Sequence, residues 1–205
     1  METFEFIIGA YGRPNELMME INSIYAQKAK NWKIHVISDG DYDGFDRVKK
    51  YFEGDDKIKF STVYGPNGRY NDWGFSPRQY GIDQSTADWI IMTGDDNYYF
   101  PVFLDNFNAC VDGETNFIFC NMMHNYSNYV PEKTELRKVI YPDGFFRYEG
   151  IDIGCFASRA KYAKQIEIQK HLHWADGQYV ADYWEKFCKE PKSIKKIDQV
   201  FYVHN

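Results

Sequence analysis

The sequence predicts an α/β fold in a single domain, with a mostly parallel sheet flanked by helices. Short apolar segments with strand character alternate with helical segments through the first half, a pattern typical of parallel sheets covered by helices. The length of 205 residues suits one domain. Aromatic residues make up 19% of the chain, which excludes a disordered protein and a simple bundle of Ala, Leu, Glu and Lys helices.

Four apolar runs in the first half predict strands at residues 4–10, 33–38, 58–63 and 89–92. The first helix begins at Pro14, whose missing N–H is not needed in a first helical turn. Leu17, Ile21 and Ile24 follow it at helical spacing. Two further helices are expected at 47–52 and 77–85. Strand and helix therefore alternate up to about the middle of the chain.

The second half is less regular and contains a long stretch rich in Tyr and Asn. We expect a helix at 101–110, a strand at 117–120 and an irregular segment at 121–150. A strand at 153–157, helices at 158–165 and 176–187, and a closing strand at 197–203 complete the prediction. The aromatic stretches 70–75 and 121–148 have two interpretations: core packing and ordered loops, which account for most of their rings, or the lining of a ligand pocket, because pockets are rich in aromatic residues.

Charge and hydropathy limit the possible partners. The net charge of −6 argues against a general nucleic-acid binder, which usually carries a basic excess. No apolar run reaches 18 residues, and the N-terminus does not look like a signal peptide, so no transmembrane segment is expected. These observations predict a soluble, cytoplasmic protein.

Four strand ends are the expected ligand-binding positions, because open parallel sheets bind ligands beyond the carboxyl ends of their strands. They are residues 10–13, 38–41, 94–97 and 203–205. Asp95, Asp96 and Asn97 follow an apolar strand, and such hard oxygen ligands suit Mg²⁺ or Mn²⁺. A solvated acidic turn is the alternative interpretation, because Asp and Asn are common in turns.

Other charged residues at or near these positions have two interpretations each. Asp39 suits a ribose or base contact, or a local turn. Arg13 and Arg78 can bind a phosphate or base edge, or form surface salt bridges. His204 is either exposed or completes a metal site beside Asp95 and Asp96.

Asp176 and Asp152 stand near the starts of two later elements. Asp176 opens the predicted helix at 176–187, where Asp commonly caps the helix, although a general base is the alternative. Asp152 precedes a predicted strand and is either a ligand contact or a turn residue.

Together, these segments resemble the GT-A nucleotide-diphospho-sugar glycosyltransferases, especially the large inverting family 2. The resemblance covers nearly the whole chain and rests on five segments in the right order. They are IIGAYGRP at 7–14, ISDGD at 37–41, SPRQYGI at 76–82, DWIIMTGDDN at 88–97 and WADG at 174–177, with VHN at 203–205 behind them. The chain is also similar to glycosyltransferases of large algal viruses.

The resemblance implies a role for each candidate residue. Nucleotide and donor contacts are expected from Ala10, Tyr11, Arg13, Asp39, Arg78 and Asp95. Asp96 and His204 would bind Mn²⁺ or Mg²⁺, Asp176 would be the catalytic base, and Asp152 and Trp174 would contact the sugar or the acceptor. The match departs from the family pattern at Gly94, which stands where the first acid of the metal-binding triplet is usual.

The expected activity is metal-dependent, inverting transfer of a sugar from a nucleoside-diphosphate sugar to a hydroxyl of a glycan or glycoprotein. UDP is the favoured nucleotide, with GDP and dTDP open. Residues 1–205 would form one GT-A domain, with a nucleotide-sugar-binding half at 1–100 and an acceptor-binding half at 101–205, as all or part of a longer protein.

Two other functions remain open. A sugar-1-phosphate nucleotidyltransferase shares the fold and the metal, but residues 9–13 lack the long Gly-rich loop with a downstream Lys that cradles a triphosphate. A non-catalytic carbohydrate-binding domain of the same fold would explain the missing acid at Gly94.

Overall fold

The computed structural model describes residues 1–125, 136–140, 151–170, 172 and 174–205. The first half contains β1 (Phe4–Ala10), α1 (Pro14–Tyr25), β2 (Trp32–Asp39), α2 (Phe45–Tyr51), β3 (Ile58–Val63), α3 (Phe75–Gln84) and β4 (Trp89–Thr93). The second half contains β5 (Tyr98–Tyr99), α4 (Phe103–Ala109), β6 (Phe117–Asn125), β7 (Leu136–Val139), the 3₁₀-helix η2 (Ile153–Cys155), β8 (Phe156–Arg159), α5 (Ala160–Ala163), α6 (Ala175–Phe187), η3 (Pro191–Ser193) and β9 (Ile194–His204).

The described strands form one sheet in the order β3-β2-β1-β4-β8-β6-β9-β5, with β7 paired to β6. The four strands of the first half are parallel to one another, so their carboxyl ends share one edge. This arrangement confirms the predicted α/β class. The second half adds antiparallel pairs at β4–β8, β6–β8, β6–β7 and β5–β9, while β6 and β9 run parallel.

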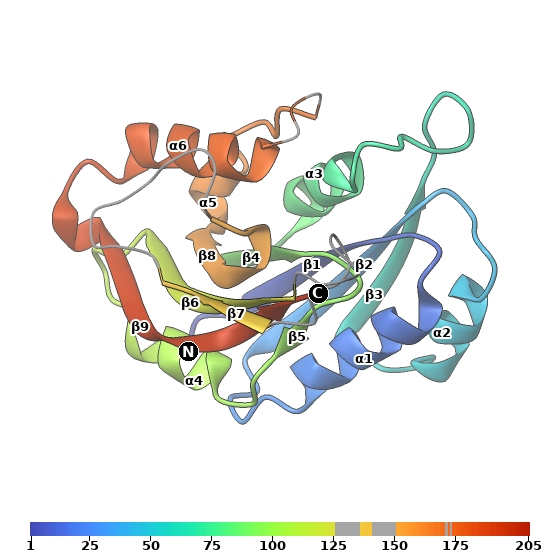
Figure 1. The fold of residues 1–205 in the computed structure, drawn as a ribbon, viewed down its shortest axis with the longest axis horizontal. Helices are drawn as coiled ribbons and strands as arrows, with labels where there is room; N and C mark the ends of the chain where they lie inside the picture. The colour runs from blue at the N-terminus through green and yellow to red at the C-terminus, as the bar shows by residue number, and fades with distance from the viewer. Residues whose placement is uncertain (126–135, 141–150, 171, 173) are drawn as a thin grey trace.

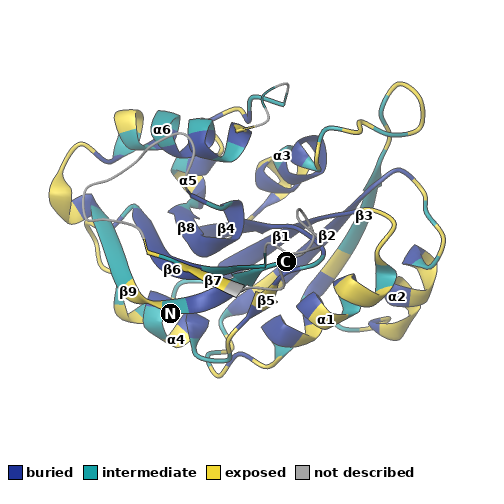
Figure 2. Cartoon of the chain, viewed as in Figure 1, coloured by how far each residue is buried: buried dark blue, intermediate teal, exposed yellow. Residues whose placement is uncertain are grey.

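Helices lie on both faces of the curled sheet. Figure 1 shows α3, α5 and α6 on one side and α1, α2 and α4 on the other. The central strands are buried on both faces, as expected for a parallel sheet, and every residue of β1 and β4 is buried. Figure 2 shows this continuous buried layer between the two sets of helices. The described helices are too short or too polar to span a bilayer.

Several predicted elements need correction in the second half. Residues 153–155 form a 3₁₀ turn instead of a strand, because the Asp152 side chain accepts a hydrogen bond from Gly154 N at 2.9 Å. The predicted helix at 158–165 shortens to α5, since Ser158 and Arg159 pair with β4 as part of β8. The segment 121–150 is not wholly irregular, because β6 extends to Asn125 and β7 pairs with it.

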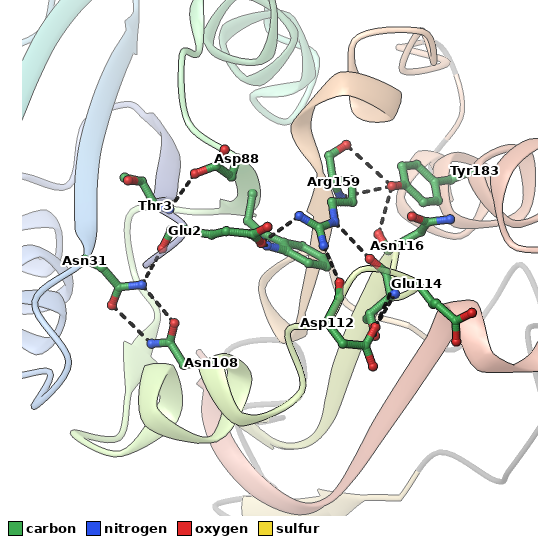
Figure 3. A network of polar contacts seen from close by, with 12 residues as sticks. Glu2, Thr3, Asn31, Asp88, Asn108, Asp112, Glu114, Asn116, Arg159 and Tyr183 are labelled. Carbon is green, nitrogen blue, oxygen red and sulfur yellow. Dashed lines mark hydrogen bonds and ion pairs between the residues drawn. The ribbon is translucent and has the colours of Figure 1, made fainter.

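One polar network joins the start of the chain to the second half, and Arg159 lies at its centre (Figure 3). The guanidinium donates to Glu2 Oε2 at 2.6 Å, Thr115 O at 2.9 Å and Asp112 O at 2.7 Å. It also lies 4.3 Å from the centre of the Trp89 ring. Tyr183 OH donates to Asn116 O at 2.9 Å, which adds α6 to the network. These contacts hold the parallel half and the mixed half of the sheet together.

Candidate active site

A cavity of about 710 Å³ opens at the carboxyl ends of β1, β2 and β4, the edge expected to bind ligands. It is lined by Gly9, Ala10, Tyr11, Arg13, Asp39, Arg69, Asn71, Trp73, Gly74, Phe75, Arg78, Gly94, Asp95, Asp96, Asn97, Asp152, Ile153, Asp176, His204 and Asn205. Ten of the eleven candidate residues from the sequence therefore face one cavity. The eleventh, Trp174, lies exposed just before α6 and outside this lining.

The acidic turn after β4 lies against the loop between β1 and α1. Asp95 is almost fully buried, and its Oδ2 accepts a hydrogen bond from Tyr11 N at 2.8 Å. Its Oδ1 lies 2.5 Å from Arg13 Nη2. Arg13 Nη1 forms a second ion pair with Asp96 Oδ2. One guanidinium therefore bridges both carboxylates of the turn.

Arg13 does not fully compensate the buried acids. Burial raises the pKa values of Asp95 and Asp96, although the charge of Arg13 opposes that shift for both groups. Asp152 and Asp176 line the same cavity and add two more carboxylates. Carboxylates held this close in a buried site favour a further cation or the uptake of protons.

Asp39 organises the loop at the other end of the cavity. Its two oxygens accept hydrogen bonds from Tyr70 N at 2.8 Å and Asn71 N at 3.0 Å. Arg69 Nε lies 3.5 Å from Asp39 Oδ2, and the Arg69 guanidinium lies 3.1 Å from the centre of the Tyr11 ring. This end of the cavity thus combines a flat aromatic ring, a cation and a carboxylate.

Arg78 is buried at the floor of the cavity, on α3. Its Nε donates to Thr93 O at 2.7 Å and its Nη1 donates to Trp73 O at 2.8 Å. Two backbone carbonyls therefore hold the guanidinium between α3 and the end of β4. From there its charge lowers the pKa values of Asp96 and Asp176, against the larger raising effect of burial.

Gly94 is closely packed in the acidic turn. A Cβ at this position would lie 3.2 Å from Asn97 Nδ2 and 3.2 Å from Asp96 Oδ1. Contacts this short are tighter than ordinary van der Waals packing, so a side chain here would push against both residues. An acid at Gly94 would therefore need Asn97 and Asp96 to shift by a few tenths of an ångström.

His204 reaches the cavity at the end of β9. Its Nδ1 lies 3.1 Å from Asp152 Oδ2, and its ring lies 4.5 Å from the His124 ring at its edge. Asn205 N donates to Asn97 Oδ1 at 3.3 Å, which ties the end of β9 to the acidic turn. The last strand thus places an imidazole beside carboxylates that are far away in sequence.

Asp176 lies in the first turn of α6, while Trp174 is the residue at the N-cap position. The predicted cap is therefore displaced, and Asp176 lines the cavity instead. Burial, followed by the charge of Asp152, raises the pKa of Asp176 to about 7. A carboxyl group with such a pKa can accept a proton from a weakly acidic group near neutral pH.

A buried polar cluster supports the acidic turn from α1. Thr93 Oγ1 donates to Glu20 Oε1 at 2.8 Å and accepts from Asn97 Nδ2 at 3.0 Å. Asn97 N donates to Glu20 Oε2 at 3.4 Å, and Glu20 is fully buried. Burial raises the pKa of Glu20 well above its usual value. This cluster holds Asn97 between α1 and the end of β9.

Sequence reasoning did not single out Arg69, Asn71 or Trp73, which also line the cavity. Trp73 has a positive φ of 56° and Asn71 one of 57°, conformations that bulky residues rarely adopt. The indole of Trp73 is nonetheless 64% exposed. The aromatic stretch 70–75 thus lines part of the cavity, while its contact with a sugar or acceptor stays a prediction. Residues 126–135 and 141–150, which hold most of the other aromatic stretch, lie outside the described residues.

The donor chemistry of the cavity fits a divalent metal. Carboxylate oxygens and an imidazole are ligands that Mn²⁺ accepts, and Mg²⁺ prefers the oxygens. Within the described residues, no group of three or more His, Cys, Asp or Glu side chains forms a complete site. A metal bound by one or two protein ligands would complete its coordination with substrate phosphates and water, as Mg²⁺ commonly does.

Comparison with known proteins agrees with this architecture. No curated protein matches the chain in sequence. S. aureus TarS 1-349 in complex with UDP matches with a TM-score of 0.74 at 14% identity, over 98% of this chain and 60% of that chain. A mannosyltransferase from Pyrobaculum calidifontis in complex with GDP-Man and Mn²⁺ matches with a TM-score of 0.70 at 12% identity, over 99% of this chain and 56% of that chain.

A third solved structure is glucosyl-3-phosphoglycerate synthase from Mycobacterium tuberculosis, in complex with Mn²⁺, UDP and phosphoglyceric acid. It matches with a TM-score of 0.65 at 9% identity, over 100% of this chain and 71% of that chain. In the TarS comparison, the chain spans about 60% of the length of the matched structure. These likenesses show a shared GT-A fold.

The family model for glycosyl transferase family 2 matches residues 5–166. Because this match covers well over half of the sequence, the chain belongs to glycosyl transferase family 2.

Proposed function

We propose that this chain transfers a sugar from a nucleoside-diphosphate sugar, with UDP favoured, to a hydroxyl of a glycan or glycoprotein, with inversion and with a divalent metal. The observation that carries the proposal is a single cavity lined by an aromatic ring, Tyr11, by the acidic pair that Arg13 bridges, and by a separate, half-buried carboxyl group, Asp176. The complexes of related folds with UDP and with GDP-Man are consistent with such a donor.

The donor nucleotide would bind along the first-half edge of the cavity. Tyr11 offers a ring face to the base, with Arg69 already lying over that ring. Asp39 shapes the neighbouring loop through Tyr70 N and Asn71 N, and can reach a ribose or base edge from the same place. Arg13 and Arg78 would add positive charge near the diphosphate, where it stabilises the charge that develops in the transition state.

Asp96 and His204 would hold the metal, with Asp95 nearer the ribose or sugar. The metal would stabilise the negative charge on the leaving nucleoside diphosphate as a Lewis acid. Asp152 would orient His204 through the 3.1 Å contact to its Nδ1. A carboxylate behind a metal-binding imidazole fixes the ring orientation and raises the basicity of the ligand.

Asp176 would be the base that accepts the proton of the acceptor hydroxyl. It is half-buried in the first turn of α6, where it lines the cavity, and its pKa of about 7 suits proton uptake near neutral pH. One base and a single displacement imply inversion at the anomeric carbon. The charge of Asp152 acts on both Asp176 and His204, and its carboxylate can also contact a sugar hydroxyl.

The proposal is tested by thermal-shift measurements with a panel of nucleotide sugars, each with and without Mn²⁺. A donor that binds the native state raises the apparent melting temperature. We expect UDP-sugars to stabilise the chain with Mn²⁺, and Asp96→Ala to lose metal-dependent hydrolysis of the donor. Release of pyrophosphate from a nucleoside triphosphate would instead indicate a nucleotidyltransferase. Sugar binding without any donor turnover would indicate a binding domain.

A further inference from the structure

Arg13 occupies the place between Asp95 and Asp96 where a bound metal cation would lie. Its Nη2 lies 2.5 Å from Asp95 Oδ1 and its Nη1 is paired with Asp96 Oδ2. The second oxygen of Asp95 already accepts from Tyr11 N. Three of the four carboxylate oxygens in the pair are therefore engaged, two of them by one side chain. Any divalent cation that binds this pair must compete with the guanidinium.

The surroundings of Arg13 allow the guanidinium to move. The side chain is 49% exposed, whereas Asp95 and Asp96 are 1% and 12% exposed, so the guanidinium lies on the solvent side of the pair. Arg13 precedes α1 without a side-chain capping bond. Gly12 before it has a φ of +73°, and nothing lies within 4 Å of where a Cβ would be. The side chain can leave the pair without repacking the core.

We propose that Arg13 is an internal counter-ion that a divalent cation displaces from Asp95 and Asp96, and that the displaced guanidinium then binds the diphosphate of the donor. The charges around the cavity support this exchange. Five carboxylates line the cavity against three guanidinium groups, so the acids outnumber the arginines; the acids are Asp39, Asp95, Asp96, Asp152 and Asp176, and the arginines are Arg13, Arg69 and Arg78. A metal supplies the missing charge, and the diphosphate supplies a new partner for Arg13.

The exchange makes metal and nucleotide binding cooperative. A metal that binds alone must break the ion pairs of Arg13 and leaves the guanidinium without an anion. When the nucleoside diphosphate is present, the same displacement moves Arg13 onto phosphate, where a guanidinium forms charge-assisted hydrogen bonds. The metal must then bind more tightly with the nucleotide, and the nucleotide more tightly with the metal by the same factor.

This inference rests on the proposed function, and the test keeps the two separable. Mn²⁺ binding to the full chain is measured from the loss of the free Mn²⁺ electron paramagnetic resonance signal, with and without UDP. Wild type, Arg13→Gln and Arg47→Gln are compared. Arg47 is an exposed cation on α2 that donates to Asn15 Oδ1, so its variant removes the same charge without touching the acidic turn.

For wild type, we expect UDP to tighten Mn²⁺ binding by a factor within about 5–150, the usual range for coupled sites. Arg13→Gln should bind Mn²⁺ alone about tenfold more tightly than wild type, and UDP should tighten its binding at least about fivefold less. Arg13→Lys should fall between the two, because an ammonium cannot bridge two carboxylates as a planar guanidinium does. Arg47→Gln should match wild type.

Two results separate the possible failures. If wild type binds no Mn²⁺ even with UDP, the proposed metal-dependent function is wrong. If wild type binds Mn²⁺ with UDP but Arg13→Gln shows unchanged or weaker binding of Mn²⁺ alone, the counter-ion role is wrong while the proposed function stands. Circular dichroism melts of each variant show that it is folded, and Arg13→Lys carries the test if Arg13→Gln does not fold.

Discussion

His204 Nδ1 lies 3.1 Å from Asp152 Oδ2, and this contact joins the end of the last strand to the turn before β8. The two side chains are 21% and 10% exposed and line the same cavity. The other oxygen of Asp152 accepts from Gly154 N at 2.9 Å, so the backbone of η2 holds the carboxylate in place. Asp152 is therefore held beside the imidazole that we propose as a metal ligand, in position to orient it.

Replacing Asp152 tests this orientation. In Asp152→Asn, one amide oxygen still accepts from Gly154 N, but the charge beside His204 is lost. We expect Mn²⁺ binding in the presence of UDP to weaken by about 10–100-fold, the usual effect of removing such a supporting residue. The same resonance titration measures it. Asp41→Asn is the control, because Asp41 is exposed and contacts Tyr64 OH. Equal Mn²⁺ affinity in both variants would contradict the orientation role.

The raised pKa of Asp176 predicts the pH dependence of transfer. The base must be ionised, and burial followed by the charge of Asp152 raises its pKa to about 7. The rate of transfer should therefore fall about tenfold per unit as the pH drops below 7, and should level off above it. Removing the charge in Asp152→Asn should move the midpoint to lower pH. Single-turnover rates between pH 5.5 and 8.5 measure both effects.

Substitution of Asp176 separates binding from chemistry. Asp176→Asn should keep UDP and Mn²⁺ binding and lose transfer, because an amide cannot accept the proton. Asp182→Asn on the same helix is the matched control, since Asp182 accepts from Gln178 Nε2 at 2.7 Å and lies outside the cavity lining. Transfer by Asp176→Asn at the wild-type rate would contradict the assignment of Asp176 as the base.

The hydroxyl of Thr93 is predicted to be important for stability. In Thr93→Val the shape is nearly kept, but the buried Glu20 Oε1 loses its donor and Asn97 Nδ2 loses its acceptor. We expect the free energy of unfolding to drop by about 1–3 kcal/mol, as for other unsatisfied buried polar groups. Urea denaturation measures the change. Thr93→Ser keeps the hydroxyl and should lie closer to wild type; the reverse order would contradict the prediction.

The lowered pKa of His35 leads us to expect a loss of stability in acid. It is buried on β2, and its Nε2 shares a 2.9 Å hydrogen bond with Ser61 Oγ. Burial, followed by the charge of Lys59, lowers the pKa of His35 from 6.5 to about 4. Between these pH values the unfolded chain therefore binds one proton more than the folded chain. The free energy of unfolding decreases by about 1.4 kcal/mol for each unit by which the pH is lowered.

The matched variant is His35→Gln, which can keep the bond to Ser61 without titrating. Its free energy of unfolding should fall less steeply than that of wild type between pH 6.5 and 4, by about 3 kcal/mol in total. Urea denaturation at several pH values provides the comparison. Parallel pH profiles for the two proteins would exclude His35 as the source.

Much of the first half could be predicted from local pattern. The strand at 4–10 has the same limits in the structure, and the one at 58–63 does too. Apolar runs of this length, broken by Gly, Pro and Asp, report on burial and on turns, and both act over a few residues. The strand-end rule then correctly placed Asp95, Asp96 and Asp39 at one edge, because parallel strands share their carboxyl ends.

The second half was less predictable because its elements depend on distant partners. The two-residue strand β5 exists through its pairing with β9, more than 100 residues later in the chain. The helix expected at 158–165 is shortened because Ser158 pairs with β4 and β6. Local sequence carries no signal for such pairs, so tertiary contacts decide these elements.

The sequence by itself determined the class of fold, the polar strand ends and ten of the twenty residues that line the cavity. Only the tertiary structure decided how those residues are paired: that Arg13 bridges Asp95 and Asp96, that Asp152 contacts His204, and that Trp73 faces the cavity while Trp174 does not. The physical reason is range. Burial and turn patterns are written in neighbouring residues, whereas ion pairs form between side chains that the fold brings together across the whole chain.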